Sequence, residues 1–308
     1  MSERNCTRRE ALAKMAVFAG TSLAGPFAGA SPRYHPVLSA QAYIWIQRFE
    51  AAKKSLSDGV EEMLAGFKTA GYSNVDLNDS FVDSKLREKT LGLLKKYGLS
   101  MPTFYANSTM HEARMAEHSI KTIVELAQAT REAGVRGIVT NPSPKPNQGR
   151  KSDGELATQA RYLNQLGGEL QKLGIRFMVH HHTPELLDNA REWRHQLANT
   201  DPNTVGCCVD VHWAYRGGQE PAAFVAEVGN RLESLHLRNS KGGVWMEDLN
   251  DGDVDYHKVA EHLRETGYNG YLVVELAYEK GTTITRSLEE DLKASRLYTE
   301  KVFGLQNS

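Results

Sequence analysis

The chain has 308 residues, of which 40% are hydrophobic and 24% are charged, and its formal net charge is −1. This composition is that of a globular protein with enough apolar residues for one large core. The near-zero charge, without a stripe rich in Lys and Arg, argues against binding to nucleic acid or to an anionic membrane surface. Three cysteines are too few for a disulfide framework, and we expect the adjacent Cys207 and Cys208 to pack on opposite faces of a buried strand.

The first thirty residues have the features of an export signal. Residues 7–14 resemble a twin-arginine signal, and the uncharged stretch Met15–Ala30 follows them. Small residues at positions 28–30 offer a cleavage site, and sixteen uncharged residues are too few for a comfortable membrane span. We therefore expect a signal peptide at residues 1–30 and one mature domain at residues 31–308. The protein would be periplasmic or otherwise exported and would meet the membrane only during export; an ordinary secretory leader or an uncleaved anchor is the alternative.

Helix-like segments that end in glycine alternate with short apolar runs along the mature chain. The glycines are Gly71, Gly98, Gly134, Gly174 and Gly267, and the first four lie 27 to 40 residues apart, the size of one βα unit. With a first strand at residues 38–45, the chain has eight predicted strands. Helices are expected at residues 59–68, 83–96, 113–133, 153–173, 184–198, 221–229, 255–265 and 288–302. Eight alternating units predict an α/β fold, a single (β/α)8 TIM barrel, with an open doubly wound sheet as the alternative.

Four of the apolar runs end on a side chain that can bind a metal ion. The runs cover residues 177–180, 207–210, 232–236 and 272–275, and their last residues are His180, Asp210, His236 and Glu275. Parallel strands of one barrel end at the same face, so these side chains would share one cup. Two imidazoles and two carboxylates suit one divalent ion, either Mn, Zn, Co or Mg. Four unrelated polar residues at strand ends are the alternative.

Four motifs lie around the last three predicted strands. They are Val209–His212, Ser234–Asn239, Gly252–Tyr256 and Gly267–Glu275. Together they resemble xylose isomerase-like TIM barrels, the superfamily of sugar phosphate isomerases and epimerases. The resemblance extends over residues 37–304 and is clearest in the last 130 residues.

The resemblance implies a metal site formed by Glu, Asp, His and Glu from the last four strands. Asp210, His236 and Glu275 match this set, but three histidines, at positions 180–182, stand where many members have the first Glu. The motif places His180 at the ligand position. His182 shares its strand face, so His182 and Glu185 would support the metal site or contact the substrate.

The resemblance also implies an exported, metal-dependent sugar isomerase or epimerase. Epimerases of the family use two Glu residues, one on each side of an enediolate intermediate. In this chain histidines replace one of the two, so the symmetric pair is absent. Here Glu275 would take a proton and His180 or His182 would return one, because the ordinary pKa of His lies near neutral pH. If the substrate carries a leaving group β to its carbonyl, the same enediolate would lose it. A dehydratase or keto-glycoside lyase is therefore the alternative function, and a non-catalytic sugar-binding barrel is a further one.

The expected partner is a small sugar or a glycoside. Trp213 and Trp245 would stack on a sugar face or pack at the rim of the site. His212 would contact the substrate or cap its strand. Arg238 and Lys241 would hold a phosphate or a carboxylate, or form a solvated pair.

Nucleic acid is not expected as a partner. The same barrel serves abasic-site endonucleases, which need a basic groove for DNA. Residues 31–308 instead carry a net charge near −3, from 33 Lys and Arg against 36 Asp and Glu. Barrels of this kind often pair, so a homodimer is one expectation.

Overall fold

The structure is a computed structural model that describes residues 34–146 and 149–305. The predicted export signal at residues 1–30 lies outside these residues. No helix within the described ranges is both long and apolar enough to cross a membrane.

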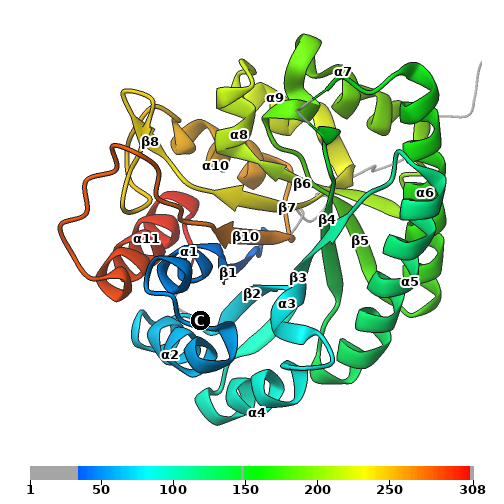
Figure 1. Cartoon of the computed structure of the whole chain (residues 1–308). Helices are drawn as coiled ribbons and strands as arrows, with labels where there is room; N and C mark the ends of the chain where they lie inside the picture. Colours follow the sequence, from blue (N-terminus) through cyan, green and yellow to red (C-terminus); the bar gives the residue numbers. More distant parts are fainter. Residues whose placement is uncertain (1–33, 147–148, 306–308) are drawn as a thin grey trace, which may run out of the picture. The chain divides into compact units, whose positions relative to one another are not determined.

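Eight parallel strands form a closed barrel (Figure 1). Their order around the barrel is β1, β10, β7, β6, β5, β4, β3 and β2, and β1 closes the ring because it pairs with both β10 and β2. The strand bounds are β1 Val37–Gln41, β2 Asn74–Asn78, β3 Ser100–Ser108, β4 Gly137–Pro142, β5 Arg176–Val179, β6 Val205–Asp210, β7 Leu232–Leu237 and β10 Tyr271–Val274. The predicted single TIM barrel is confirmed.

Helices surround the strands, and the eight predicted helices are all present with ends shifted by at most four residues (Figure 1). They are α2 Leu56–Thr69, α4 Arg87–Tyr97, α5 Ala113–Thr130, α6 Asp153–Lys172, α7 Thr183–Asn199, α9 Pro221–Val228, α10 Tyr256–Glu265 and α11 Leu288–Phe303. Three further short helices were not predicted: α1 Tyr43–Ala51, α3 Asp79–Val82 and α8 Val211–Arg216. A hairpin of β8 Ser240–Lys241 and β9 Val244–Trp245 follows β7.

Local sequence signals explain where several helices begin and end. Helix α6 starts with a capping box, in which Ser152 and Glu155 each accept a hydrogen bond from the other's backbone N–H. Helix α4 ends at Gly98, whose φ of 60° is the left-handed conformation that glycine adopts without a Cβ clash. The first predicted strand is wrong beyond Gln41, because residues 43–51 form α1 and not an extension of β1.

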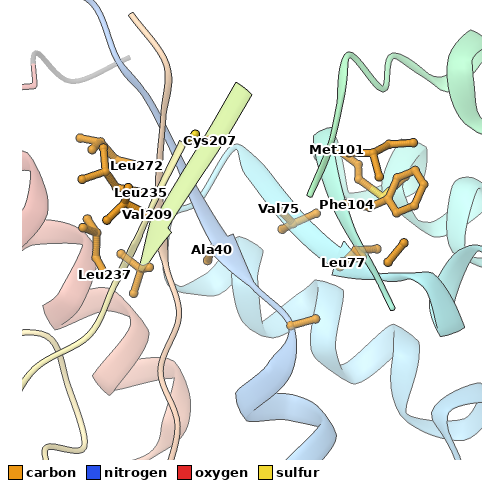
Figure 2. Close-up of a cluster of buried hydrophobic side chains, with 14 of the residues drawn as sticks. Ala40, Val75, Leu77, Met101, Phe104, Cys207, Val209, Leu235, Leu237 and Leu272 are labelled. Carbon is orange, nitrogen blue, oxygen red and sulfur yellow. The ribbon is translucent and has the colours of Figure 1, made fainter. Parts of the chain in front are cut away.

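Apolar side chains fill two layers. The outer layer lies between the strands and the helices and includes Val75, Phe104 and Cys207 (Figure 2). The inner layer is a small cluster of Val139, Met178 and Cys208, with Tyr105 packed against it. Cys207 and Cys208 therefore face opposite sides of β6, as predicted. The inner cluster lies among the strands, on the side of the sheet that faces the barrel interior.

Candidate functional site

The strand ends bring four predicted metal-capable side chains together. Asp210 ends β6, His236 lies in β7, and His180 and Glu275 directly follow β5 and β10. One ligand atom from each of the four lies within 4.8 Å of all the others. All four side chains are buried, and Glu275 is the most exposed at 8%.

The buried nitrogens of the site need a partner. Within the described residues, neither Nδ1 nor Nε2 of His180 has a hydrogen-bond partner, and Nε2 of His236 also lacks one. Buried polar atoms without partners are costly and therefore rare. Burial lowers the pKa of His180 well below its ordinary value, and His236 adds to this shift, so the imidazole is neutral, as a metal ligand must be. Two imidazoles and two carboxylates at this spacing fit a divalent cation.

Arg238 follows β7 and reaches into the same cluster. Its Nη2 donates to Oδ2 of Asp210 at 2.9 Å and to Oε2 of Glu275 at 2.8 Å. Nδ1 of His236 lies 2.9 Å from the same oxygen of Glu275. Burial raises the pKa of Glu275, but Arg238 and His236 outweigh it and lower the pKa to about 2. Glu275 therefore stays ionised inside a buried site, whereas burial raises the pKa of Asp210, a shift that Arg238 opposes. The structure thus gives Arg238 carboxylate partners in place of the solvated pair with Lys241.

A cavity of about 460 Å³ opens above this cluster. The predicted residues that line it are His182, Trp213, Arg238, Trp245 and Glu275. The remaining lining residues come from the ends of β1, β2 and β3 and the segments that follow them: Gln41, Tyr43, Ile46, Asn78, Asp79, Ser80, Tyr105 and Asn107. A cavity of this size, with aromatic residues on one side and amides and hydroxyls on another, suits a small polar ligand.

The predicted aromatic residues form one wall, which is held by two arginines. The guanidinium carbon of Arg238 lies 4.9 Å from the ring centre of Trp245 and 5.4 Å from that of Trp213. Arg216 lies over the same Trp245 ring at 4.5 Å. Glu279 accepts hydrogen bonds from Arg216 and from the backbone N–H of Trp245. These contacts fix the indoles as a rigid apolar surface.

The three histidines after β5 have three different surroundings. His180 belongs to the metal-capable cluster. His182 faces the cavity, and its ring centre lies 4.8 Å from that of His180. His181 points to the helices and packs on Trp193, with ring centres 4.6 Å apart. The buried carboxylate of Glu185 accepts a hydrogen bond from the backbone N–H of His182 at 2.8 Å. Burial, with Glu192 beside it, raises the pKa of Glu185 to about 7.

Three predicted substrate contacts lie away from the cavity wall. His212 is buried behind Trp245, whose Nε1 donates to Nδ1 of His212 at 3.2 Å, and Nε2 of His212 lies 2.9 Å from the hydroxyl of Ser240. Lys241 is exposed on β8, and Glu185 supports His182. In this structure His212 and Glu185 hold residues of the cavity wall in place instead of lining it.

The residues that sequence reasoning missed come from the first three strands. Gln41, Asn78 and Asn107 are amides, and amides are common in loops, so residue type alone does not mark them. For Asn78 and Asn107 the position near the end of a strand offered the available signal, whereas Gln41 lies inside the first predicted strand, which extends too far. Cys208 was also taken only as a packing residue, although its sulfur lies within 4.8 Å of ring nitrogens of His180 and His236.

Comparison with known proteins identifies the family of the chain. The family model of xylose isomerase-like TIM barrels matches residues 59–300. The inosose dehydratase of Clostridium perfringens strain 13 is 25% identical over 272 residues, which cover 78% of this chain and 88% of that protein. The rhizopine catabolism protein MocC of Rhizobium meliloti is 24% identical over 245 residues, or 70% of this chain and 74% of that protein.

A solved structure shows the same fold. The structure of an L-ribulose 3-epimerase superimposes with a TM-score of 0.71 at 12% identity, covering 87% of this chain and 95% of the epimerase. At this identity the match speaks for the fold alone. The family model, in contrast, spans most of the described barrel, including the four strand ends that carry the metal-capable cluster. The chain therefore belongs to the xylose isomerase-like TIM barrel family.

Proposed function

We propose that this protein is a divalent-metal-dependent dehydratase that acts next to the carbonyl group of a small sugar or cyclic polyol ketone. The observation that carries this proposal is the asymmetry of the site. Of the four metal-capable side chains, Glu275 lines the cavity, and imidazoles stand where a second Glu would complete a matched pair. Loss of water needs one base and one proton donor, which do not have to be alike. Relatives named inosose dehydratase support this reaction type.

His180, Asp210, His236 and Glu275 would hold the metal ion. When bound, a divalent ion polarises a carbonyl and makes the neighbouring C–H more acidic. Glu275 is the base in this proposal, since its carboxylate is ionised and lines the cavity. His236 and Arg238 both contact its Oε2, which leaves Oε1 to accept the proton.

His182 is the proton donor in this proposal. Burial lowers the pKa of His182 to about 4, so the ring is neutral at pH 7 and carries one N–H and one lone pair. The N–H would protonate the departing hydroxyl as its C–O bond breaks, and the ring would recover a proton from the carboxyl group of Glu275. The products would be water and an unsaturated ketone, and both side chains would return to their starting states. Glu185 would hold the backbone of His182 in place.

Sugar epimerisation is the second candidate. Glu275 and His182 both line the cavity, so one could remove a proton and the other could return it to the opposite face of the same carbon. This route would have no leaving group. Isomerisation of a ketose would use the same first step and return the proton to the neighbouring carbon.

Export is a separate proposal that rests on the twin-arginine-like motif at residues 7–14. A route that exports folded protein would let the metal ion be loaded before export. Replacing Arg8 and Arg9 with Lys should keep the protein in the cytoplasmic fraction, whereas unchanged fractionation would contradict the proposal.

The test of function uses the metal-loaded protein in heavy water, with an inosose and with free ketoses as substrates. A dehydratase yields a product that has lost one water, as read by mass spectrometry. An epimerase yields a product of unchanged composition with deuterium at one carbon, as read by NMR. Glu275→Gln should abolish both. If the protein binds metal but neither removes water from any substrate nor introduces deuterium into it, a non-catalytic sugar-binding barrel is favoured.

A further inference from the structure

The charged groups on the cavity wall provide no surplus of positive charge for the phosphate of a phosphorylated sugar. Among the residues that line the cavity, Arg238 is the one Lys or Arg side chain, and Asp79 and Glu275 are the carboxylates. The other basic side chains near this face are engaged or remote. Arg216 pairs with Glu279 behind Trp245, and Lys241 lies exposed on the hairpin.

Two buried carboxylates already offset the positive charge of Arg238. Its Nη2 contacts Asp210 and Glu275, its guanidinium lies over Trp213 and Trp245, and the residue is 3% exposed. A phosphate that approached Arg238 would compete with two buried carboxylates. Removing the arginine from either carboxylate would leave a buried charge without its partner, which is strongly unfavourable.

Asp79 adds a fixed negative charge on the β2–β3 side of the cavity. Its Oδ2 accepts from the backbone N–H of Asn107 at 3.0 Å, and its Oδ1 accepts from that of Ser80 at 2.8 Å. The carboxylate is therefore held in one orientation, beside the amides of Asn78 and Asn107. Such a group accepts hydrogen bonds from sugar hydroxyls and repels a phosphate dianion.

A bound divalent ion would bring the net charge of these groups only to zero. The charges of a divalent ion and Arg238 would be matched by those of Asp210, Glu275 and Asp79. A phosphate would thus lose its water shell in a site with no surplus positive charge. Uncharged hydroxyl groups face no such cost, and the apolar wall of Trp213 and Trp245 suits the C–H face of a sugar ring.

We infer that this site selects uncharged sugars or polyol ketones over their phosphorylated counterparts, and that Asp79 is a residue that determines this selectivity. The inference rests on the proposed function as a sugar-binding enzyme. It goes further by naming the charge class of the substrate and the side chain that enforces it.

Matched pairs of probes test the inference on the full-length, metal-loaded protein. D-fructose is compared with D-fructose 6-phosphate, and D-psicose with D-psicose 6-phosphate, by ligand-observed NMR in direct competition. Inorganic phosphate alone shows how much of any phosphate binding is due to the metal. We expect the neutral member of a pair to bind at least about tenfold more tightly, a difference of about 1.4 kcal/mol.

Two variants separate the role of Asp79 from a general effect of charge. Asp79→Asn removes the charge and keeps one oxygen, which can accept from the backbone of either Ser80 or Asn107 but not from both. It should reduce the preference for the uncharged sugar severalfold. Asp83→Asn is the control, because Asp83 is a half-buried capping residue of the same segment that does not line the cavity. It should leave the preference unchanged.

The outcomes distinguish this inference from the proposed function. Equal or tighter binding of the phosphorylated member overturns the inference and leaves the sugar site intact. An unchanged preference in Asp79→Asn overturns the role of Asp79. Binding of neither member of either pair, with metal still bound, overturns the proposed function and the inference with it.

Discussion

Nη2 of Arg238 lies 2.8 Å from Oε2 of Glu275, and the same nitrogen lies 2.9 Å from Oδ2 of Asp210. One arginine thus bridges two carboxylates that would also be ligands of a metal ion. In the absence of metal, Arg238 offsets the charges of both carboxylates, and His236 also offsets that of Glu275. A metal ion would bring its own positive charge to the same oxygens, so Arg238 and the ion compete for these groups or share them.

The stability of an Arg238 variant should therefore depend on metal. Arg238→Gln should cost about 3–5 kcal/mol of unfolding free energy in the presence of a chelator, because Asp210 loses its cation and Glu275 keeps only His236. Saturating Mn²⁺ or Zn²⁺ should recover much of this loss. The control is Arg216→Gln, which removes the arginine on the other side of the Trp245 contact without touching Asp210 or Glu275. Urea unfolding measures the stability of the parent and the two variants. If Arg238→Gln loses the same unfolding free energy with and without metal, Arg238 and the metal ion do not compete for the carboxylates.

The ligand set leads to a second prediction about metal content. His180→Ala, Asp210→Ala and Glu275→Ala should each lose the bound ion, whereas His182→Ala should retain it, because His180 and not His182 belongs to the group within 4.8 Å. His195, which lies in α7 outside this group, supplies the control His195→Ala. Elemental mass spectrometry of the purified proteins gives the metal content per chain. Loss of metal in His182→Ala with retention in His180→Ala would reverse the assignment of the first ligand.

Much of the barrel and of its metal-capable cluster follows from local sequence patterns. A buried parallel strand is a short apolar run, and a helix ends well at glycine, so the strands and helices could be placed from the sequence. The strand ends then identified His180, Asp210, His236 and Glu275, because parallel strands deliver their last residues to one face.

The features that could not be predicted depend on contacts between distant segments. Residues 43–51 continue an apolar run, and such a run alone does not distinguish strand from helix. Trp45 packs as part of a helix, with its ring 6.0 Å from that of Phe49 and 6.1 Å from that of Phe67. In the same way, nothing local to Arg238 shows that it turns back between two carboxylates, one of them on a strand 28 residues earlier.

Glu185 should make the stability of the protein depend on pH. Its folded-state pKa of about 7 lies above the ordinary value of 4.5, owing to burial and to Glu192, while Lys151 acts in the opposite direction. The folded state therefore keeps a proton that the unfolded chain has lost. Stability is lost as the pH rises from 4.5 to 7, by about 3 kcal/mol.

Replacing the carboxyl group of Glu185 with an amide tests this pH dependence. Glu185→Gln should lose less unfolding free energy than the parent protein between pH 5 and pH 8, as measured by urea unfolding. The exposed Glu265 on α10 supplies the control Glu265→Gln, which should follow the parent. Parallel pH curves for the parent and Glu185→Gln would mean that Glu185 is ionised in the folded state.

Two glycines should respond to the same substitution with opposite signs. A Cβ at Gly252 would overlap the backbone oxygen of Ser240 and lie 2.9 Å from the side chain of Asn239, whereas a Cβ at Gly168 in α6 would meet no atom within 4 Å. Gly252→Ala should therefore cost about 1–3 kcal/mol, since a backbone atom must move. Gly168→Ala should gain up to about 1 kcal/mol, because alanine is the better helix former.

The Gly252 change should also loosen the hairpin that carries Trp245, because the neighbouring Asp253 binds Ser240 and the backbone of Gly243. Thermal unfolding and the fluorescence of the site tryptophans report the two effects separately, and a Gly252→Ala protein as stable as the parent would show that the hairpin adjusts without loss.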